Sequence, residues 1–304
     1  MYNTKFIQDF MNYYDYPAEA KELFTEVLQK LDESKRLTRS FEALRDKYLS
    51  HRTRIDPLTV RLAIMAKTIG YSEYTLNFVF LLSLTEDLYK KYKLIGIDEK
   101  IYYDTMGDLK YKLLECMECE KVPGTFVPGW YDGFFRMTRF AYGRFQFELG
   151  TYTSDTPFTL SCGKVIKKGD TYIGMHIPSS GVSLTDDVRL ASYKDAYKHV
   201  NSLFDDGIVI FGCGSWLLYP KHREFLPEKM NIRRFMDDFE LVSWDEKDDF
   251  HDSWRIFGYE SDLPVDQLPR DTLLRKSYAE WFEKGGKGGS GFGMFAFDGE
   301  KILR

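Results

Sequence analysis

The sequence has little of what marks secreted or membrane proteins. Its 304 residues include only four cysteines, too few for the disulfide framework of a small secreted domain. No apolar run approaches the roughly 18 residues that a membrane-spanning helix needs, and the longest, Leu76–Leu84, is much shorter. The first residues, Met1–Lys5, contain no apolar signal core. We therefore expect a cytoplasmic protein without a membrane partner.

Charge of one sign is also scarce. The 42 lysines and arginines are balanced by 47 aspartates and glutamates, so the formal net charge is -5, and no long basic run appears. Proteins that bind nucleic acid usually carry a concentrated basic face, so we expect no nucleic-acid partner. What the chain does have is apolar material. Hydrophobic residues make up 43% of it and aromatic residues 16%, enough for the core of one large domain or two ordinary ones.

The first part of the chain shows helical periodicity only. Apolar residues recur at three- and four-residue spacing in Leu23–Leu31 and again in Tyr74–Leu94. Asp56 followed by Pro57 predicts an N-cap and a first-turn proline for a helix that Gly70 ends. No internal repeat is present. We therefore expect this half of the protein to be all-helical.

Cys116 and Cys119 form a Cys-x-x-Cys spacing inside another helical pattern, Leu109–Glu120. A zinc site would need two further ligands, and a redox motif usually begins a helix beside a strand. We expect these cysteines to pack inside the helix bundle, and we expect no metal site.

The pattern changes at a Pro/Gly-rich joint, 122–129, after which strands and helices alternate. The sequence thus predicts an all-helical N-terminal domain over 1–124 and a mixed α/β domain over 125–304. In the second domain the expected strands are 139–149, 171–177, 208–213, 232–244, 253–258 and 292–297. The expected helices are 185–204, 216–226 and 271–284. A hairpin is expected within 161–175, and the glycine-dense 285–293 is expected to be a lid or a turn.

The segment Tyr172–Trp216 is the most informative part of the second domain. It predicts a strand, a loop, an amphipathic helix and a second strand. A crossover of this length joins parallel strands, so the carboxyl ends of the two strands lie at one edge of the sheet. Open α/β sheets bind their ligands at such an edge. The side chains expected there are His176, Ser179, Ser180, Cys213 and Ser215.

Six short segments carry a resemblance to a known family. They are Gly143–Glu148, Met175–Pro178, Cys213–Leu218, Asn231–Phe235, Arg255–Gly258 and Leu268–Leu273. In this order they resemble the bacterial acyltransferases that join a helical N-acyltransferase N-terminal domain to a GNAT-like C-terminal domain. The resemblance covers nearly the whole chain. It implies an α+β fold, an all-helical domain followed by a GNAT-like mixed α/β sheet domain, and acetyl-CoA or another acyl-CoA as co-substrate.

In the family, two parallel strands splay apart to admit the pantetheine, and the pyrophosphate binds at the loop and helix N-terminus after the first strand. The resemblance therefore implies that the loop 178–184 holds the coenzyme. The implied coenzyme-binding residues are Ile177, Ser179, Ser180, Gly181, Ser183 and Ser215. This loop departs from the usual pattern, because Gly181 is its only glycine and Asp186 and Asp187 would repel a phosphate.

His176 and Glu148 are the candidate bases. His176 ends a central strand, where an amine nucleophile needs a base that titrates near neutral pH. Glu148 shares a strand face with Gln146 and Arg144, and these two residues, with Arg255, are the candidates for binding substrate. The alternatives are a histidine that bonds a backbone carbonyl, a solvated polar face and a local ion pair.

Cys213 and Tyr219 are the candidate proton donors to the departing thiolate. Cys213 precedes a turn where a helix N-terminus or a basic group would make it a nucleophile, or else it is an inert buried thiol. Tyr219 lies where many GNAT-like enzymes keep a general acid. Ser215 has a structural alternative as a helix cap.

The resulting hypothesis is transfer of an acyl group, with acetyl as the first candidate, from coenzyme A to a small-molecule amine or peptide by direct attack. Two alternatives remain open. One is a thiol acyltransferase or hydrolase that depends on Cys213. The other is a non-catalytic ligand-binding protein, favoured by the single glycine of the loop.

Overall fold

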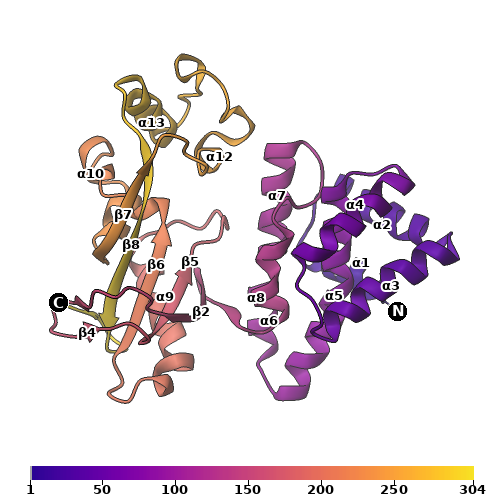
Figure 1. The fold of residues 1–304 in the computed structure, drawn as a ribbon, viewed down its shortest axis with the longest axis horizontal. Coiled ribbons are helices and arrows are strands. Elements are labelled where there is room, and N and C mark those ends of the chain that lie inside the picture. Colours follow the sequence, from indigo (N-terminus) through magenta and orange to yellow (C-terminus); the bar gives the residue numbers. More distant parts are fainter. Residues whose placement is uncertain (1) are drawn as a thin grey trace. The chain divides into compact units, whose positions relative to one another are not determined.

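The structure, a computed structural model, describes residues 2–304 and divides between Phe140 and Ala141 into a helical unit and a sheet unit (Figure 1). The sequence places the joint near 124. In the structure, residues 128–135 form two further short helices, whose Tyr131, Phe134 and Phe135 belong to the core of the helical unit. The α+β prediction, helices first and a mixed sheet second, is confirmed.

The helical unit is built around one buried helix. Its elements are α1 (Thr4–Tyr13), α2 (Ala18–Asp32), α3 (Lys35–Leu49), α4 (Asp56–Ile69), α5 (Glu73–Ile95), α6 (Glu99–Met106), α7 (Asp108–Glu120), η1 (Pro128–Tyr131) and α8 (Asp132–Phe135). Every residue from Thr75 to Thr85 is buried, so α5 is covered on all sides, as expected for a helix that is apolar all round. No helix within residues 2–304 has both the length and the apolar character needed to cross a membrane.

Helix ends in this unit follow local chemistry. Ser34, Ser72 and Asp98 accept hydrogen bonds from backbone N–H groups of α3, α5 and α6. Gly70 ends α4 in the left-handed conformation, with φ of 83°, as predicted. The predicted cap at Asp56 is wrong, because α4 begins at Asp56 itself and its carboxylate lies against Gly129.

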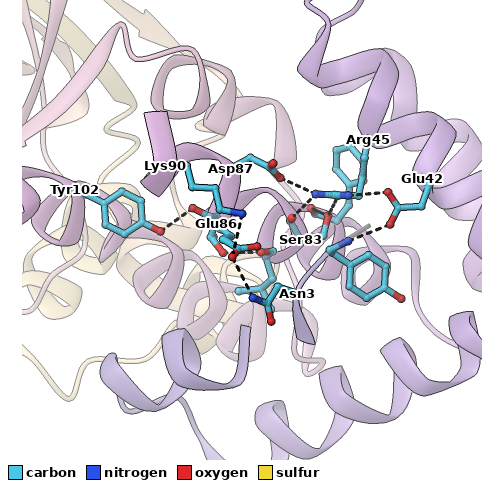
Figure 2. A network of polar contacts seen from close by, with 12 residues as sticks. Asn3, Glu42, Arg45, Ser83, Glu86, Asp87, Lys90 and Tyr102 are labelled. Atoms are coloured by element: carbon cyan, nitrogen blue, oxygen red, sulfur yellow. Dashed lines mark hydrogen bonds and ion pairs between the residues drawn. The ribbon is translucent and has the colours of Figure 1, made fainter. Parts of the chain in front are cut away.

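A buried arginine ties α3 to α5. Figure 2 shows the guanidinium of Arg45, which donates to Glu42 Oε2 at 2.7 Å and to Asp87 Oδ2 at 2.6 Å. It also donates to the hydroxyl of Ser83 at 3.1 Å and to the Ser83 carbonyl at 3.0 Å. Only 3% of the Arg45 side chain is exposed. The ion pairs and hydrogen bonds together offset the cost of burying this charge.

The sheet unit has one main sheet with the strand order β1-β2-β5-β6-β8-β7, and β9 pairs with β8. The strands are β1 (Arg139–Tyr142), β2 (Phe145–Thr151), β5 (Thr171–His176), β6 (Val209–Ser215), β7 (Glu240–Lys247), β8 (Gly288–Phe297) and β9 (Ile302–Leu303). A separate two-stranded sheet contains β3 (Phe158–Thr159) and β4 (Val165–Ile166). As predicted, β5 and β6 are parallel, whereas β2–β5, β3–β4, β6–β8, β7–β8 and β8–β9 are antiparallel.

The two faces of the sheet differ. The helix α9 (Asp186–Val200), predicted at 185–204, covers one face (Figure 1), where the ring of Tyr193 lies 5.6 Å from that of Phe145 and 4.9 Å from that of Phe295. The other face packs against the β3–β4 hairpin through Leu160 and Ile166. Apolar side chains therefore seal both faces, and alternate residues along each strand point to opposite faces.

Other helices and turns of this unit are η2 (Asn201–Leu203), η3 (Trp216–Leu218), α10 (His222–Phe225), α11 (Asn231–Met236), α12 (Trp254–Phe257), η4 (Gly258–Glu260), η5 (Val265–Gln267) and α13 (Leu273–Glu283). The last of these confirms the helix expected at 271–284. The single helix predicted at 216–226 is interrupted between η3 and α10. Tyr219 has extended backbone before Pro220, because a proline disfavours helical geometry at the preceding residue.

Three strand predictions are also wrong. The expected long strand 139–149 is a hairpin, because Gly143, with φ of 65°, reverses the chain between β1 and β2. The first part of 232–244 forms α11, and 253–258 forms α12 instead of a strand. Short apolar segments fit either periodicity, so their packing decides between helix and strand.

Most of the glycine-dense segment, 288–293, is part of strand β8 rather than a lid, and Gly285 lies in the turn before it. Added methyl groups would lie 2.4 Å from the ring of Tyr219 at Gly289 and 2.3 Å from the Leu218 carbonyl at Gly291. These glycines let neighbouring segments approach the strand closely. The turn at 168–170 exists, but it connects β4 to β5 across two sheets and closes no hairpin between them.

We expect replacement of Arg45 by methionine to lower the free energy of unfolding of the helical unit by about 3 kcal/mol. This is the low end for a broken buried ion pair, because the side chains of Glu42 and Asp87 are 18% and 36% exposed and can reach water. Lys5→Met is the control, since Lys5 and its partner Asp9 are 82% and 63% exposed, and should change it by at most about 1 kcal/mol. Urea unfolding followed by circular dichroism measures both. Equal shifts would contradict the role of Arg45.

Candidate functional site

The parallel strands β5 and β6 pair at two positions and then part. Ile173 faces Phe211 and Gly174 faces Gly212. Beyond these pairs β5 continues beside β2 as far as His176, and β6 continues beside β8 as far as Ser215. The carboxyl ends of the two central strands are therefore not paired with each other, and we call the place where they part, at the edge where the sequence predicts the site, the cleft.

Glycines form the floor on one side of this cleft. Because Gly174 pairs with Gly212, these two residues and Gly214 lie on the same face, which we call the glycine face. A methyl group added at Gly174 would find its nearest atom at 3.5 Å, and one added at Gly214 at 3.8 Å. Another group can therefore approach the backbone beside Gly174 and Gly214, whereas the ring of Tyr172 covers Gly212.

The polar centre of the glycine face is a carboxylate bonded to an imidazole. Glu148 lies opposite Gly174, and His176 lies opposite Gln146, so Glu148 and His176 are diagonal neighbours on the same face. The distance between Glu148 Oε1 and His176 Nε2 is 2.7 Å, and the two side chains are 28% and 27% exposed. Such a pair orients the imidazole, stabilises its protonated form and can take a proton from a nucleophile.

Gln146 lies two residues before Glu148 on β2 and so shares its face as predicted, whereas Arg144 lies outside the strand. Gln146 is buried, with 2% exposure, beside His176 in the pairing register. Arg144 lies in the turn between β1 and β2, because the predicted strand is a hairpin. Its guanidinium donates to the carbonyl oxygens of Pro178 and Val182, both at 2.8 Å. Arg144 therefore holds the loop that follows β5.

The rest of this loop is tied to α9 and α11. Arg189, with 4% exposure, donates to the Leu184 carbonyl at 2.6 Å and to both carboxylate oxygens of Asp238. Ser183 accepts a hydrogen bond from the side chain of Asn231 at 2.7 Å. The loop 178–184 is thus held at Pro178 and Val182 by Arg144 and at its C-terminal end by α9 and α11.

The remaining residues of the loop are open to solvent or partly so. Ser179 and Gly181 are exposed, and Ile177 and Ser180 are half-buried. Gly181 has φ of 74°, and a methyl group added there would meet no atom within 4 Å. The hydroxyl of Ser180 accepts a hydrogen bond from the Val182 N–H at 3.3 Å. The loop therefore presents mainly backbone and hydroxyl groups.

The acidic residues at the start of α9 are compensated. Asp186 accepts a hydrogen bond from Arg189 at 3.1 Å and lies 3.5 Å from the guanidinium of Arg234. A hydrogen bond from Thr185 and backbone N–H groups lower the pKa of Asp187, so it stays charged. The repulsion of a phosphate expected from the sequence is therefore reduced at Asp186 but not at Asp187.

Cys213 is not placed with the Glu148–His176 pair. It follows Gly212 on β6 and so points away from the glycine face. Its side chain is 1% exposed, and burial raises the pKa of the thiol to about 12. The thiol is therefore neutral near pH 7, whereas a nucleophile would need the thiolate.

Tyr219, Arg255 and Ser215 have local partners. Tyr219 is fully buried and its hydroxyl donates to Glu246 at 2.5 Å, which together with burial raises its pKa. Arg255 bonds Asp252 at 2.8 Å and stacks on Trp254. Ser215 accepts a hydrogen bond from the Leu217 N–H at 3.1 Å and so caps η3, which is the structural alternative raised above.

Two pockets lie beside the cleft and share Ser243 and Phe292. The first, which we call the aromatic pocket, has a volume of about 380 Å³, and its largest lining side chains are Tyr152, Phe158, Tyr172, Val242 and Phe292. The second has about 460 Å³ and begins at Gly214 and Ser215; Trp216, Trp244, Asp245, Asp252 and Ser290 line it as well. Both volumes fall in the range of ligand pockets.

Sequence reasoning missed the residues that shape these pockets. Tyr172 lies near the start of the predicted strand, two residues before Gly174 and four before His176. Alternate residues share a face, so all three lie on one face of the strand. Glycines within predicted strands, such as Gly212, also signal a close approach by another group. These two signals together would have indicated the glycine face.

Comparison with known proteins agrees with the fold. Residues 5–137 match the family model of the N-acyltransferase N-terminal domain, and residues 139–295 match that of the GNAT-like C-terminal domain. No curated protein sequence matches the chain. The resemblance noted in the sequence is confirmed.

Solved structures of acyltransferases share this fold. One, in complex with decanoyl-CoA and teicoplanin, has a TM-score of 0.73 and 18% identity over 97% of this chain and 87% of that chain. An acyltransferase mutant in complex with octanoyl-CoA has a TM-score of 0.73 and 17% identity over 97% of this chain and 88% of that chain. With both domains matched in order, the chain belongs to the acyltransferase family in which an N-acyltransferase N-terminal domain precedes a GNAT-like C-terminal domain.

Proposed function

We propose that the protein transfers the acyl group of an acyl-CoA to an amine by direct attack in the cleft between β5 and β6. The observation that carries this proposal is the Glu148–His176 pair, 2.7 Å apart on the glycine face where the strands part. Acyltransferases of the same fold, crystallised with decanoyl-CoA, octanoyl-CoA or CoA, support the choice of donor.

The cleft and its loop suit the donor in two ways. The pantetheine arm would enter between the parted strands beside Gly174 and Gly214, which no close side chain covers. The pyrophosphate would meet the backbone of the loop 178–184 and the start of α9, where N–H groups and the helix dipole favour an anion. Ser179, Gly181, Val182 and Ser183 are the exposed residues of that loop, and Ser180 is half-buried.

The chemistry balances with the residues present. The amine nitrogen attacks the thioester carbonyl, a C–N bond forms, and the C–S bond breaks. The imidazole of His176, oriented by Glu148, takes the proton that the amine loses and returns it to the departing thiolate. The products are an amide and free CoA. This role for the pair requires neither Cys213 nor Tyr219, whose side chains are buried and engaged elsewhere.

The pocket beside Gly214 suits the acceptor. Asp245 and Asp252 line it, and a hydrogen bond from Ser290 at 2.6 Å lowers the pKa of Asp245, which keeps that carboxylate charged. Negative charge attracts the ammonium form in which most amines exist at neutral pH. The pocket opens beside β6, across the cleft from His176. The ammonium must lose one proton to solvent before it can attack, and the neutral amine then meets the thioester beside His176, which takes the second proton.

The Glu148→Gln change should lower kcat by roughly 10²–10⁴-fold, the usual contribution of general base catalysis, and leave the Kd for CoA unchanged. Transfer from acetyl-CoA and octanoyl-CoA to spermidine, benzylamine and glucosamine is followed as release of the CoA thiol. Glu300→Gln makes the same chemical change at an exposed carboxylate that pairs with Lys194, and should leave kcat as in the wild type. Equal rates for both variants would rule out Glu148 as part of the base.

Removal of the Arg144 side chain should weaken CoA binding about tenfold, because two charge-assisted hydrogen bonds that hold the loop are lost. Calorimetric titration with CoA measures this, and Arg270→Ala, which removes an arginine paired with Glu283, is the control. If the wild type fails to bind CoA at millimolar concentration, the transferase proposal fails and the non-catalytic alternative stands.

Cys213→Ala should retain at least about half of the wild-type kcat, since the neutral, buried thiol takes no part in direct transfer. Mass spectrometry of the wild type after incubation with octanoyl-CoA should show no added acyl group on the protein. An adduct on Cys213 that disappears when amine is added would establish the covalent alternative instead.

A further inference from the structure

The ring of Tyr172 lies flat across three strands on the glycine face. A methyl group added at Gly150 on β2 would lie 2.6 Å from its Cζ, and one added at Gly212 on β6 would lie 2.7 Å from its Cδ2. The ring also comes within 3.8 Å of a methyl group added at Gly174. The ring of Tyr172 therefore covers Gly212 on the glycine face. Only glycine at positions 150 and 212 allows this position.

The same ring is a wall of the aromatic pocket. It meets the ring of Phe292 edge-on, with centroids 5.8 Å apart, and packs in one apolar cluster with Phe158 and Val242. Burial, and after it the charge of Glu148, raises the pKa of Tyr172, and Glu148 pairs with Gly174, two residues along β5 from Tyr172. Tyr172 thus separates the pair from the aromatic pocket.

The lining of the aromatic pocket selects its occupant. Its wall consists of aromatic rings, Val242, Pro157 and the hydroxyl-bearing residues of 151–156, and no charged side chain lines it. Phosphates and ammonium groups would lose their hydration there without gaining an opposite charge. An uncharged apolar group is the chemistry that fits, and the pocket begins beside the floor where the thioester would lie.

We propose that the aromatic pocket binds the fatty acyl chain of the acyl-CoA and that Tyr172 sets the chain length that the enzyme accepts. This inference rests on the proposed function, because the thioester in the cleft is what directs a chain toward Tyr172. It names the donor class as medium-chain acyl-CoA rather than acetyl-CoA. The ring must turn aside for a chain to pass, and the flanking glycines offer no side chain that would oppose this movement.

The test measures the affinity of the whole protein for CoA, acetyl-CoA, butyryl-CoA, octanoyl-CoA and decanoyl-CoA by calorimetry, which requires no acceptor. In the wild type, affinity should rise with chain length by about fourfold for each methylene that enters the pocket. Val242→Trp fills the pocket and should abolish this gain while CoA and acetyl-CoA bind as before. Tyr172→Ala should extend the gain to longer chains, and Tyr172→Phe should match the wild type.

Leu241→Trp is the matched control, because it adds the same bulk to the neighbouring residue of β7, which does not line the pocket. It should leave every affinity unchanged. Equal affinity of the wild type for all chain lengths, or an equal loss in Val242→Trp and Leu241→Trp, would overturn the inference while CoA binding remains intact. Failure of CoA itself to bind the wild type would overturn the proposed function and, with it, this inference.

Discussion

The short parallel ladder between β5 and β6 is the constraint on which the sheet unit depends. Within residues 2–304, it is the only link in the main sheet between the β2–β5 pair and the β6–β8–β7 group. A longer ladder would close the cleft, and a missing ladder would divide the sheet. Two pairs, Ile173 with Phe211 and Gly174 with Gly212, hold the halves together and leave the strand ends apart. His176 and Gly214 lie two residues beyond Gly174 and Gly212. Glu148 on β2 pairs with Gly174.

Glycine, which weakens strands, is used here where other groups must come close. Gly212 lies under the ring of Tyr172, and Gly289 and Gly291 on β8 lie against Tyr219 and the Leu218 carbonyl. Each such glycine costs roughly 0.5–1 kcal/mol relative to alanine in regular structure. Close packing of aromatic side chains against the bare backbone offsets that cost. The lack of a side chain, which allows this packing, also leaves the backbone accessible beside Gly174 and Gly214.

Much of the fold follows from the sequence, and the site follows only in part. The crossover from β5 through α9 to β6 was predictable because its two apolar strands are joined by a segment too long for a hairpin. His176 and Glu148 were each singled out, but their contact depends on the register of β2 against β5, which no local pattern states. Register also explains Cys213: a shift of one residue moves a side chain to the other face, and only the pairing of Gly174 with Gly212 shows that Cys213 points away.

The hydrogen bonds of Arg144 fix the backbone of the loop 178–184 rather than its side chains. Two of its acceptors are main-chain carbonyl oxygens, those of Pro178 and Val182, so these two bonds do not depend on the side chains between them. Ser180 and Gly181 can be replaced without loss of either bond, provided that the backbone path is kept. The shape of the loop is thus specified from outside it, by a residue 34 positions upstream of Pro178. A short consensus drawn from the loop alone would miss the residue that determines its shape.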